Sequence, residues 1–195
     1  MIITLKDGSK REVQEGISVI DLAKEISEGL ARVATAGRVD GKVVDLRYNL
    51  NKECNVEILT FDDEDGKKAY WHTTSHIMAQ AIKRLYKDVK LAIGPAIDDG
   101  FYYDFDTEYR FSEADFEKIE AEMKKIIKED LPIERFELPR SEAIKLMKAA
   151  GEDYKVELIE DLPEDEVLSF YKQGDFTDLC AGPHLMSTGK VKCVK

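Results

Sequence analysis

The stretch HTTSHIMAQAIKRLY, residues 72–86, decides the fold of the larger part of the chain. Its apolar residues recur three and four positions apart, which is the spacing of a helix that buries one face. The expected packing stripe consists of Ile77, Met78, Ala81, Ile82 and Leu85. His72 and His76 stand one helical turn apart on another face, where the small side chain of Ala79 leaves room. Such a helix can present both histidines to a cleft.

The histidines of the chain all fall in two short motifs. His184, the third and last of them, ends the motif CAGPH, residues 180–184, which also contains Cys180. A histidine pair at helical spacing often reflects capping or packing, but the use of every histidine in two motifs favours a site. Three imidazoles and a thiol form a ligand set suited to zinc, or the acid and base groups of a hydrolytic site.

Composition limits the classes of function. A chain of 195 residues with 43% hydrophobic and 35% charged residues can fill one large or two small domains. Its net charge of −11 argues against extended nucleic-acid binding, and the basic residues between positions 83 and 90 are interpreted as a solvated helix face. No apolar run is long enough to span a membrane, and the start does not resemble a signal peptide. Three cysteines without disulfide spacing favour a reducing, cytoplasmic location.

Residues 1–62 have the pattern of a small β-rich domain. Strands are expected at residues 2–5, 11–13, 32–36, 42–45 and 56–59. Between the second and third of these, apolar residues from Val19 onward recur at helical spacing, and Gly29 is expected to end that helix. A hairpin, a helix and further strands is the order of a β-grasp, or ubiquitin-like, fold. Cys54 is interpreted as a small buried hydrophobic residue.

The acidic stretch at residues 62–68 is expected to be a turn-forming linker, which puts the domain boundary between residues 62 and 63. Beyond it, the patterns predict a strand at 101–105, helices at 112–130 and 141–150, and a strand at 166–171. The first of these helices should bury Phe116, Ile119, Met123, Ile126 and Ile127. Residues 190–195 alternate like a strand that stops without a terminus signal, so we expect a cut inside a larger protein.

Four motifs together carry a resemblance to a known family. They are His-x-x-x-His at 72–76, GPAIDDGFYYDF at 94–105, GEDYKVELI at 151–159 and QGDFTDLCAGPH at 173–184. With the β-grasp pattern in front of them, the chain resembles the N-terminal half of the bacterial threonyl-tRNA synthetases over all 195 residues. Residues 1–62 resemble their TGS domain. Residues 63–195 are similar to the editing domain that this family shares with the alanyl-tRNA synthetases.

The resemblance implies an α+β fold, in which a small β-grasp domain precedes a larger α/β editing domain with helices packed on a mostly antiparallel sheet. By matching motif, it implies the editing residues His72, His76, Tyr103, Lys155, Asp178, Cys180 and His184, with Tyr103 in contact with substrate. The family's catalytic core, with its ATP, magnesium and zinc, should follow residue 195. Full-length proteins of the family are expected to dimerise through that core.

Physical chemistry explains why an editing domain is needed. Serine lacks one methyl group of threonine, which is worth only about 0.8 kcal/mol of burial, so a synthetic site for threonine also admits serine. A second site must then hydrolyse the ester of seryl-tRNA(Thr), the expected partner. A histidine suits the base, and Lys155 suits stabilisation of the oxyanion or positioning of water. Asp178 could orient a histidine or hold the ammonium group of the substrate.

Three other readings stay open from the sequence. The histidines could form a structural zinc site in a binding module, Cys180 with His184 or His76 could form a cysteine hydrolase, or the chain could be a TGS-type regulatory module without catalysis. His72, His76, Cys180 and His184 could hold zinc tetrahedrally, as the resemblance to the alanyl branch implies. The resemblance to the threonyl-tRNA synthetases, in contrast, implies editing that does not require a metal. We therefore expect no required cofactor, with zinc bound only adventitiously.

Overall fold

The computed structural model describes residues 1–194 and divides the chain into two compact units. The first unit comprises residues 1–73 and 182–186, and the second comprises residues 74–181 and those from Ser187 onward. No helix within residues 1–194 combines the length and the apolar character that crossing a membrane requires.

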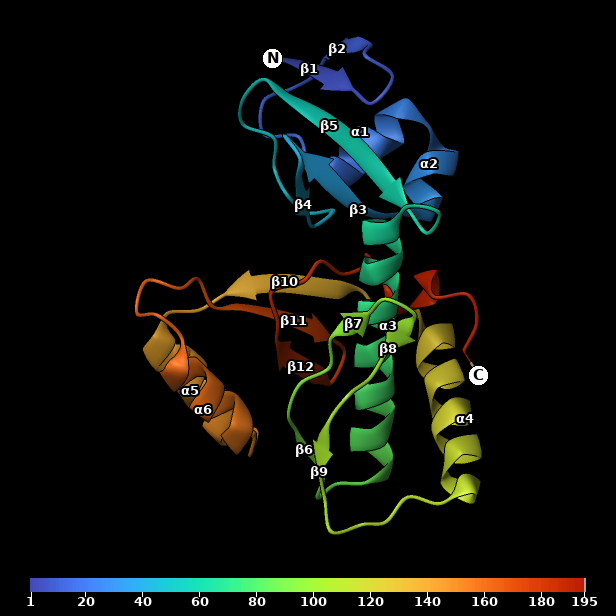
Figure 1. Cartoon of the computed structure of the whole chain (residues 1–195), viewed down its shortest axis with the longest axis vertical. Coiled ribbons are helices and arrows are strands. Elements are labelled where there is room, and N and C mark those ends of the chain that lie inside the picture. The colour runs from blue at the N-terminus through green and yellow to red at the C-terminus, as the bar shows by residue number, and fades with distance from the viewer. Residues whose placement is uncertain (195) are drawn as a thin grey trace. The chain divides into compact units, whose positions relative to one another are not determined.

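The first unit is built on a five-stranded sheet with the strand order β2-β1-β5-β3-β4. The central strands β1 and β5 run parallel, and the other pairs are antiparallel. The elements are β1 (Ile2–Leu5), β2 (Lys10–Glu12), α1 (Val19–Ile26), α2 (Glu28–Val33), β3 (Ala34–Val39), β4 (Lys42–Val44) and β5 (Cys54–Thr60). A hairpin followed by a helix and a return to the sheet centre confirms the expected β-grasp (Figure 1).

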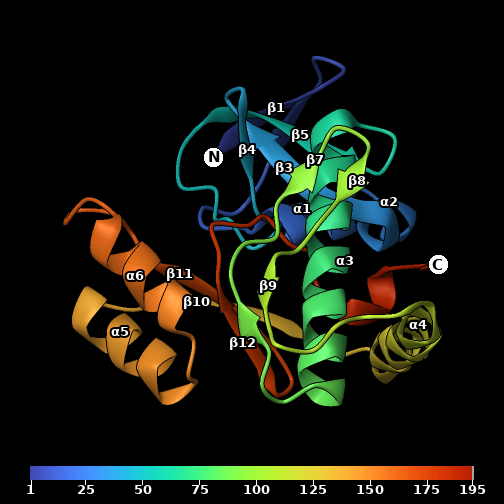
Figure 2. The ribbon, with the colours of Figure 1, turned by 60° about the horizontal axis from the view of Figure 1, so that its bottom comes forward.

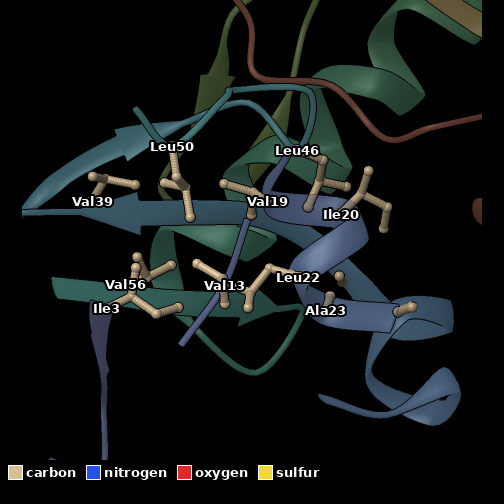
Figure 3. Packing of buried hydrophobic residues seen from close by; sticks show 12 residues of the cluster. Ile3, Val13, Val19, Ile20, Leu22, Ala23, Val39, Leu46, Leu50 and Val56 are labelled. Carbon is tan, nitrogen blue, oxygen red and sulfur yellow. The ribbon is translucent and has the colours of Figure 1, made fainter. Parts of the chain in front are cut away.

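The core of this unit lies between α1 and the sheet (Figure 3). Val19 and Leu22 of α1 are fully buried and face Ile3 and Val56 of the central strands. The expectation that Gly29 ends the helix is wrong. The helix α1 ends at Ile26, and Ser27 then caps α2 by accepting the N–H of Gly29 with its hydroxyl.

The second unit holds a three-stranded antiparallel sheet with the order β10-β11-β12. Its main elements are most of α3 (Glu64–Leu85), then α4 (Glu113–Glu129), β10 (Ile133–Glu137), α5 (Arg140–Ala149), α6 (Asp153–Asp161), β11 (Ser169–Gln173), β12 (Phe176–Leu179) and the 3-10 turn Thr188–Lys190. Two short pairs join β6 (Lys90–Leu91) to β9 (Phe105–Asp106) and β7 (Ala96–Ile97) to β8 (Gly100–Phe101).

The helices α5 and α6 lie side by side in both ribbon views (Figures 1 and 2). Met147 of α5 and Ile159 of α6 are buried in one cluster with Phe170 of β11. The pair therefore packs on the antiparallel sheet, and the expected α+β class is confirmed. The helix α6 and the strand β10 had no prediction from the sequence.

The helix α3 begins at Glu64, well before His72, so the expectation of a turn-forming linker is wrong for residues 64–68. Two acidic residues in its first turn complement the partial positive charge of a helix N-terminus. Asp63, just outside, accepts the backbone N–H of Thr60 at 2.9 Å and ends strand β5. The domain boundary proposed between residues 62 and 63 precedes this helix, whereas the division into compact units falls inside it.

Other expectations fail where packing overrides the local pattern. Leu85 at the end of α3 is 38% exposed and Phe116 on α4 is 62% exposed, although both were expected to be buried. The strand expected at 101–105 is interrupted, because only its two ends pair, in β8 and β9. Residues 190–194 end the 3-10 turn and form no strand, while Lys195 lies outside the described residues.

Candidate active site

The helix α3 carries His72 and His76 one turn apart, as the sequence predicts. The helix is buried over all of residues 73–77, and His76 is only 2% exposed, whereas His72 is half-buried. Ala79, expected beside the histidines, is fully buried in an apolar cluster with Leu91 and Phe176. His76 thus stands at the border between an apolar core and a group of charged side chains.

A buried carboxylate, Asp178 on β12, gathers three of the predicted site residues in the second unit. The hydroxyl of Tyr103 donates to its Oδ2 at 2.6 Å, and His76 Nε2 lies 3.6 Å from the same oxygen. Lys155 Nζ, from α6, lies 2.9 Å from Oδ1. Among the described residues, Oδ1 accepts no hydrogen bond beyond this ion pair. We call these four residues, His76, Tyr103, Lys155 and Asp178, the Asp178 cluster.

The charges of the cluster set the protonation of its carboxylate. Burial alone would raise the pKa of Asp178, but the Lys155 ammonium, His76 and the Tyr103 hydroxyl together hold that pKa below its ordinary value. Burial raises the pKa of Tyr103, and the negative charge of Asp178 raises it further. The cluster therefore holds an ionised carboxylate and a neutral phenol that donates to it.

Tyr103 depends on a close approach of the backbone at Gly94. A Cβ atom on Gly94 would overlap the ring of Tyr103, so the chain passes the ring only because this residue is glycine. The carbonyl of Gly94 accepts the hydroxyl of Ser75 on α3 at 3.1 Å. Of the two adjacent tyrosines, Tyr103 is buried and Tyr102 is 41% exposed. This agrees with an extended backbone, in which successive side chains point to opposite sides.

His184 is completely buried and belongs to the first unit together with His72. The two rings lie 4.4 Å apart between centroids, tilted by 34°. Thr73 Oγ1 lies 3.0 Å from His184 Nδ1, and the backbone N–H of His184 donates to Asp45 at 3.1 Å. His184 is therefore held from both its ring and its backbone.

Cys180 follows directly after β12. Its backbone N–H donates to the carbonyl of Ser169 at 3.0 Å, and the Ser169 hydroxyl donates to its carbonyl at 2.6 Å, so the position of its backbone is fixed by β11. One ligand atom from each of His72, His76, Cys180 and His184 lies within 4.8 Å of the others, which makes this a group that could hold a metal ion. The donor set, three imidazoles and one thiol, fits the coordination preference of zinc.

Sequence reasoning missed three side chains next to the predicted site. Thr73 lies inside the His-x-x-x-His motif, and its position between the two histidines was the available signal. Asp45 and Arg47 follow β4, and both contact the segment that contains His184. They are separated from it by well over a hundred residues, and neither lies in a motif.

Comparisons with known proteins agree with this architecture. The family described as "TGS domain" matches residues 1–60, and "Threonyl and Alanyl tRNA synthetase second additional domain" matches residues 168–195. The chain is 68% identical over 193 residues to the threonine–tRNA ligase of Acetivibrio thermocellus. It is 64% identical over 195 residues to that of Caldanaerobacter subterraneus and 66% identical over 193 residues to that of Clostridium botulinum. These matches cover 99–100% of this chain and 30% of each relative.

The chain thus combines a TGS domain with the second additional domain of the threonyl- and alanyl-tRNA synthetases. Over its whole length it is similar to the N-terminal region of bacterial threonine–tRNA ligases, as the motifs predict.

Proposed function

We propose that the chain hydrolyses the aminoacyl ester of seryl-tRNA(Thr), so that serine attached in error is removed. The observation that carries this proposal is the Asp178 cluster, in which a histidine, a lysine and a tyrosine surround one buried carboxylate. Ester hydrolysis by water needs a base and a positive charge or donor for the developing oxyanion. His76 and Lys155 are suited to these two roles.

Asp178 acts in this proposal as the group that orients and stabilises the others. Its two oxygens are already engaged by Lys155, Tyr103 and His76, which favours orientation over binding the substrate's ammonium group. A carboxylate 3.6 Å from His76 stabilises the imidazolium that forms when the histidine accepts a proton. His72 and His184, whose ring centroids lie 4.4 Å apart in the first unit, are further imidazoles that we propose take part in the reaction.

The test is the hydrolysis of Ser-tRNA(Thr) and Thr-tRNA(Thr) by the 195-residue chain. The serine ester should react faster, because the second site holds serine and clashes with the extra methyl of threonine. The net charge of −11 predicts weak and salt-sensitive tRNA affinity, so rates are compared at saturating protein. Equal rates on both esters would contradict the proposed selectivity.

The same reaction serves to test the role of metal. Zinc fits the donor set of His72, His76, Cys180 and His184, and it would supply Lewis-acid chemistry if bound there. Lys155 already brings a positive charge to the Asp178 cluster, and two cations in one small site repel each other. We therefore expect hydrolysis to survive exhaustive chelation and added zinc to inhibit it by occupying the histidines. Activity that is lost with chelator and restored by stoichiometric zinc would reverse this conclusion.

A cysteine hydrolase is the second candidate, because Cys180 belongs to the same group of ligand atoms. A thiol nucleophile would leave an acyl-thioester that can be trapped, and Cys180→Ser would abolish the reaction. Under the proposal of attack by water, no acyl-enzyme accumulates. In the full-length protein we propose ligation of threonine to tRNA(Thr) in the cytoplasm, with ATP, magnesium and zinc bound in a dimeric catalytic core outside this chain.

A further inference from the structure

The segment that carries His184 has no regular secondary structure, yet all four backbone polar groups of His184 and Leu185 bond to side chains. The N–H of His184 donates to Asp45 Oδ2 at 3.1 Å, and the N–H of Leu185 donates to Thr73 Oγ1 at 3.0 Å. Arg47 donates to both carbonyls, at 3.3 Å to His184 and at 2.9 Å to Leu185. Buried backbone groups must find partners, and here side chains rather than strands provide them.

The two charged side chains in this set also hold each other. Arg47 Nη1 pairs with Asp45 Oδ1 at 2.9 Å, and that same oxygen accepts the backbone N–H of Arg47 at 2.8 Å. The side chains are only 10% exposed for Asp45 and 18% exposed for Arg47. A planar guanidinium with several fixed donors is thereby oriented toward two successive carbonyls, whereas a lysine would keep the charge but lack this planar arrangement of donors.

Thr73 holds the ring of His184 in addition to the backbone of Leu185. Its hydroxyl has one proton, which it donates to the carbonyl of Ala69 one helical turn earlier, at 3.1 Å. The contact at 3.0 Å between Thr73 Oγ1 and His184 Nδ1 is then made by the proton of Nδ1. Neutral His184 consequently carries its proton on Nδ1 and its lone pair on Nε2.

We propose that Asp45 and Arg47 of the β-grasp fold are positioning residues for His184, and that the TGS region thereby sets the rate of editing. The TGS region would then contribute directly to editing, because its side chains Asp45 and Arg47 hold the backbone of His184, a histidine of the editing motif. The inference rests on the proposed hydrolysis of seryl-tRNA(Thr). It assigns no contact between Asp45 or Arg47 and the substrate.

The experiment compares Arg47→Ala, Arg47→Lys and the control Arg38→Ala in the 195-residue chain. Arg38 is a matched arginine of the same unit, paired at 2.9 Å with each of Glu57 and Asp65 rather than with the backbone of His184 and Leu185. Arg47→Ala should lower kcat for Ser-tRNA(Thr) hydrolysis by about tenfold to a hundredfold, without a comparable change in KM. Arg47→Lys should recover part of the loss, and Arg38→Ala should keep the wild-type kcat.

Rates are measured well below the unfolding transition of each variant, so that lost stability alone does not change them. A kcat for Arg47→Ala equal to that of Arg38→Ala would overturn the proposal, whatever happens to Tm. If the wild-type chain does not hydrolyse Ser-tRNA(Thr), the proposed function fails, and hydrogen exchange then decides the positioning role. Faster exchange of the His184 and Leu185 amides in Arg47→Ala, but not in Arg38→Ala, supports positioning, and unchanged exchange overturns it.

Discussion

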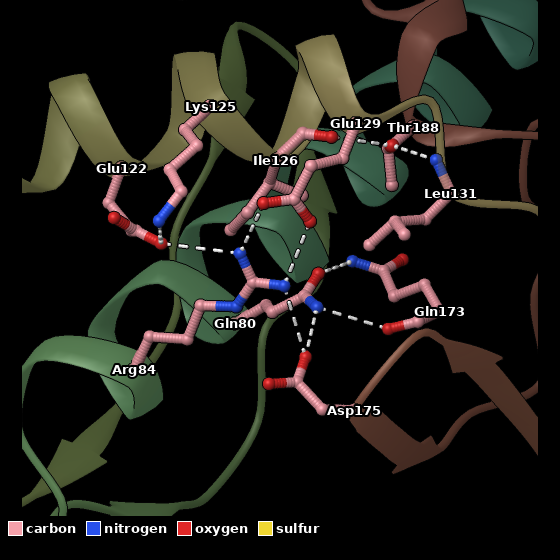
Figure 4. A network of polar contacts seen from close by, with 10 residues as sticks. All are labelled: Gln80, Arg84, Glu122, Lys125, Ile126, Glu129, Leu131, Gln173, Asp175 and Thr188. Atoms are coloured by element: carbon pink, nitrogen blue, oxygen red, sulfur yellow. Dashed lines mark hydrogen bonds and ion pairs between the residues drawn. The ribbon is translucent and has the colours of Figure 1, made fainter.

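Two polar groups in the second unit are built on the same stripe of α3 but differ in kind. His76, Gln80 and Arg84 are spaced four residues apart, so they follow one face of the helix. His76 belongs to the Asp178 cluster, whereas Gln80 and Arg84 belong to a network with α4 and the β11–β12 turn (Figure 4). That network consists of Gln80, Arg84, Glu122, Glu129, Gln173 and Asp175.

The network satisfies its members with several partners each. Gln80 and Gln173 exchange hydrogen bonds, and Gln80 also donates to Asp175 at 2.7 Å. Arg84 donates to both carboxylate oxygens of Glu129 at 3.0 Å, and these hydrogen bonds are the main cause that raises the pKa of Arg84. Its acidic partners keep side-chain exposures of 15–64%, so the charges remain partly solvated.

The Asp178 cluster lacks this solvation. Side-chain exposures are 3% for His76, 2% for Asp178 and 4% for Lys155. Burying an ion pair rarely stabilises a fold more than apolar packing would, because desolvation offsets the attraction. The network around Arg84 is therefore explained by its contribution to stability, whereas the buried charges of the Asp178 cluster are better explained by a role in catalysis.

The largest expected effect is on the rate of hydrolysis, which should depend on the histidines of the candidate site and not on the network around Arg84. His72→Ala, His76→Ala and His184→Ala should each abolish Ser-tRNA(Thr) hydrolysis, a loss of about a hundredfold or more, while Tm stays nearly unchanged or rises. Gln80→Ala is the matched control on α3. It should keep the rate and lower stability by about 1–3 kcal/mol, because the partners of Gln80 in the network become unsatisfied. Hydrolysis rates and thermal unfolding of metal-free samples measure both effects, and a large fall in Tm for all three histidine variants would favour a structural cluster.

A second prediction concerns the ion pair between Lys155 and Asp178. Lys155→Met leaves a buried carboxylate without its cation, so the pKa of Asp178 should rise, and stability should fall by about 3–5 kcal/mol at neutral pH. Lys155→Met combined with Asp178→Asn should regain most of that stability without regaining activity. Denaturant unfolding at neutral pH measures the three proteins. If the double variant were as unstable as the single one, shape rather than charge would explain the loss.

The sequence predicts the parts of this fold whose causes are local. The β-grasp order follows from period-two patterns and turn residues, and the helix capped by Ser112 follows from apolar spacing, so both were placed within a few residues. Phe116 and Leu85 are exposed although the apolar spacing predicts that both are buried. Periodicity identifies the apolar face of a helix, but it does not show how far along that face the packing element extends. The start of α3 was missed since an acidic run is compatible both with a loop and with the first turn of a helix.

The candidate site shows the same division. Its histidines, Asp178 and Cys180 stand in short motifs, whereas Asp45 and Arg47 have no local pattern at all. Their contacts with His184 and Leu185 join residues 137–139 positions apart, and only the folded chain brings them together. Long-range side-chain to backbone bonds of this type leave no periodic trace in a sequence.

The smallest expected effect concerns the carboxylate of Asp115 on α4. It accepts its hydrogen bonds mainly from neutral donors. It accepts the hydroxyls of Tyr86 at 2.7 Å and Tyr109 at 2.9 Å, and the N–H of Ser112 at 2.8 Å. The hydrogen bonds of Tyr86 and Ser112 hold the pKa of Asp115 well below its ordinary value of 3.8. The ionised form is thus favoured in the folded state.

A depressed folded pKa stabilises the protein above the unfolded pKa, and this contribution is lost as pH falls toward the folded value. Asp115→Asn should therefore lower Tm at pH 7 by a few degrees, since an amide cannot accept from every donor. The difference in Tm from the wild type should shrink steadily as the pH falls below about 4. Glu113→Gln is the control, because Glu113 lies in the same first turn of α4 and is exposed. Thermal unfolding between pH 7 and pH 2 measures both variants. A gap for Asp115→Asn that stayed constant over this range would mean that the geometry of the hydrogen bonds, and not the ionisation of the carboxylate, makes Asp115 stabilising.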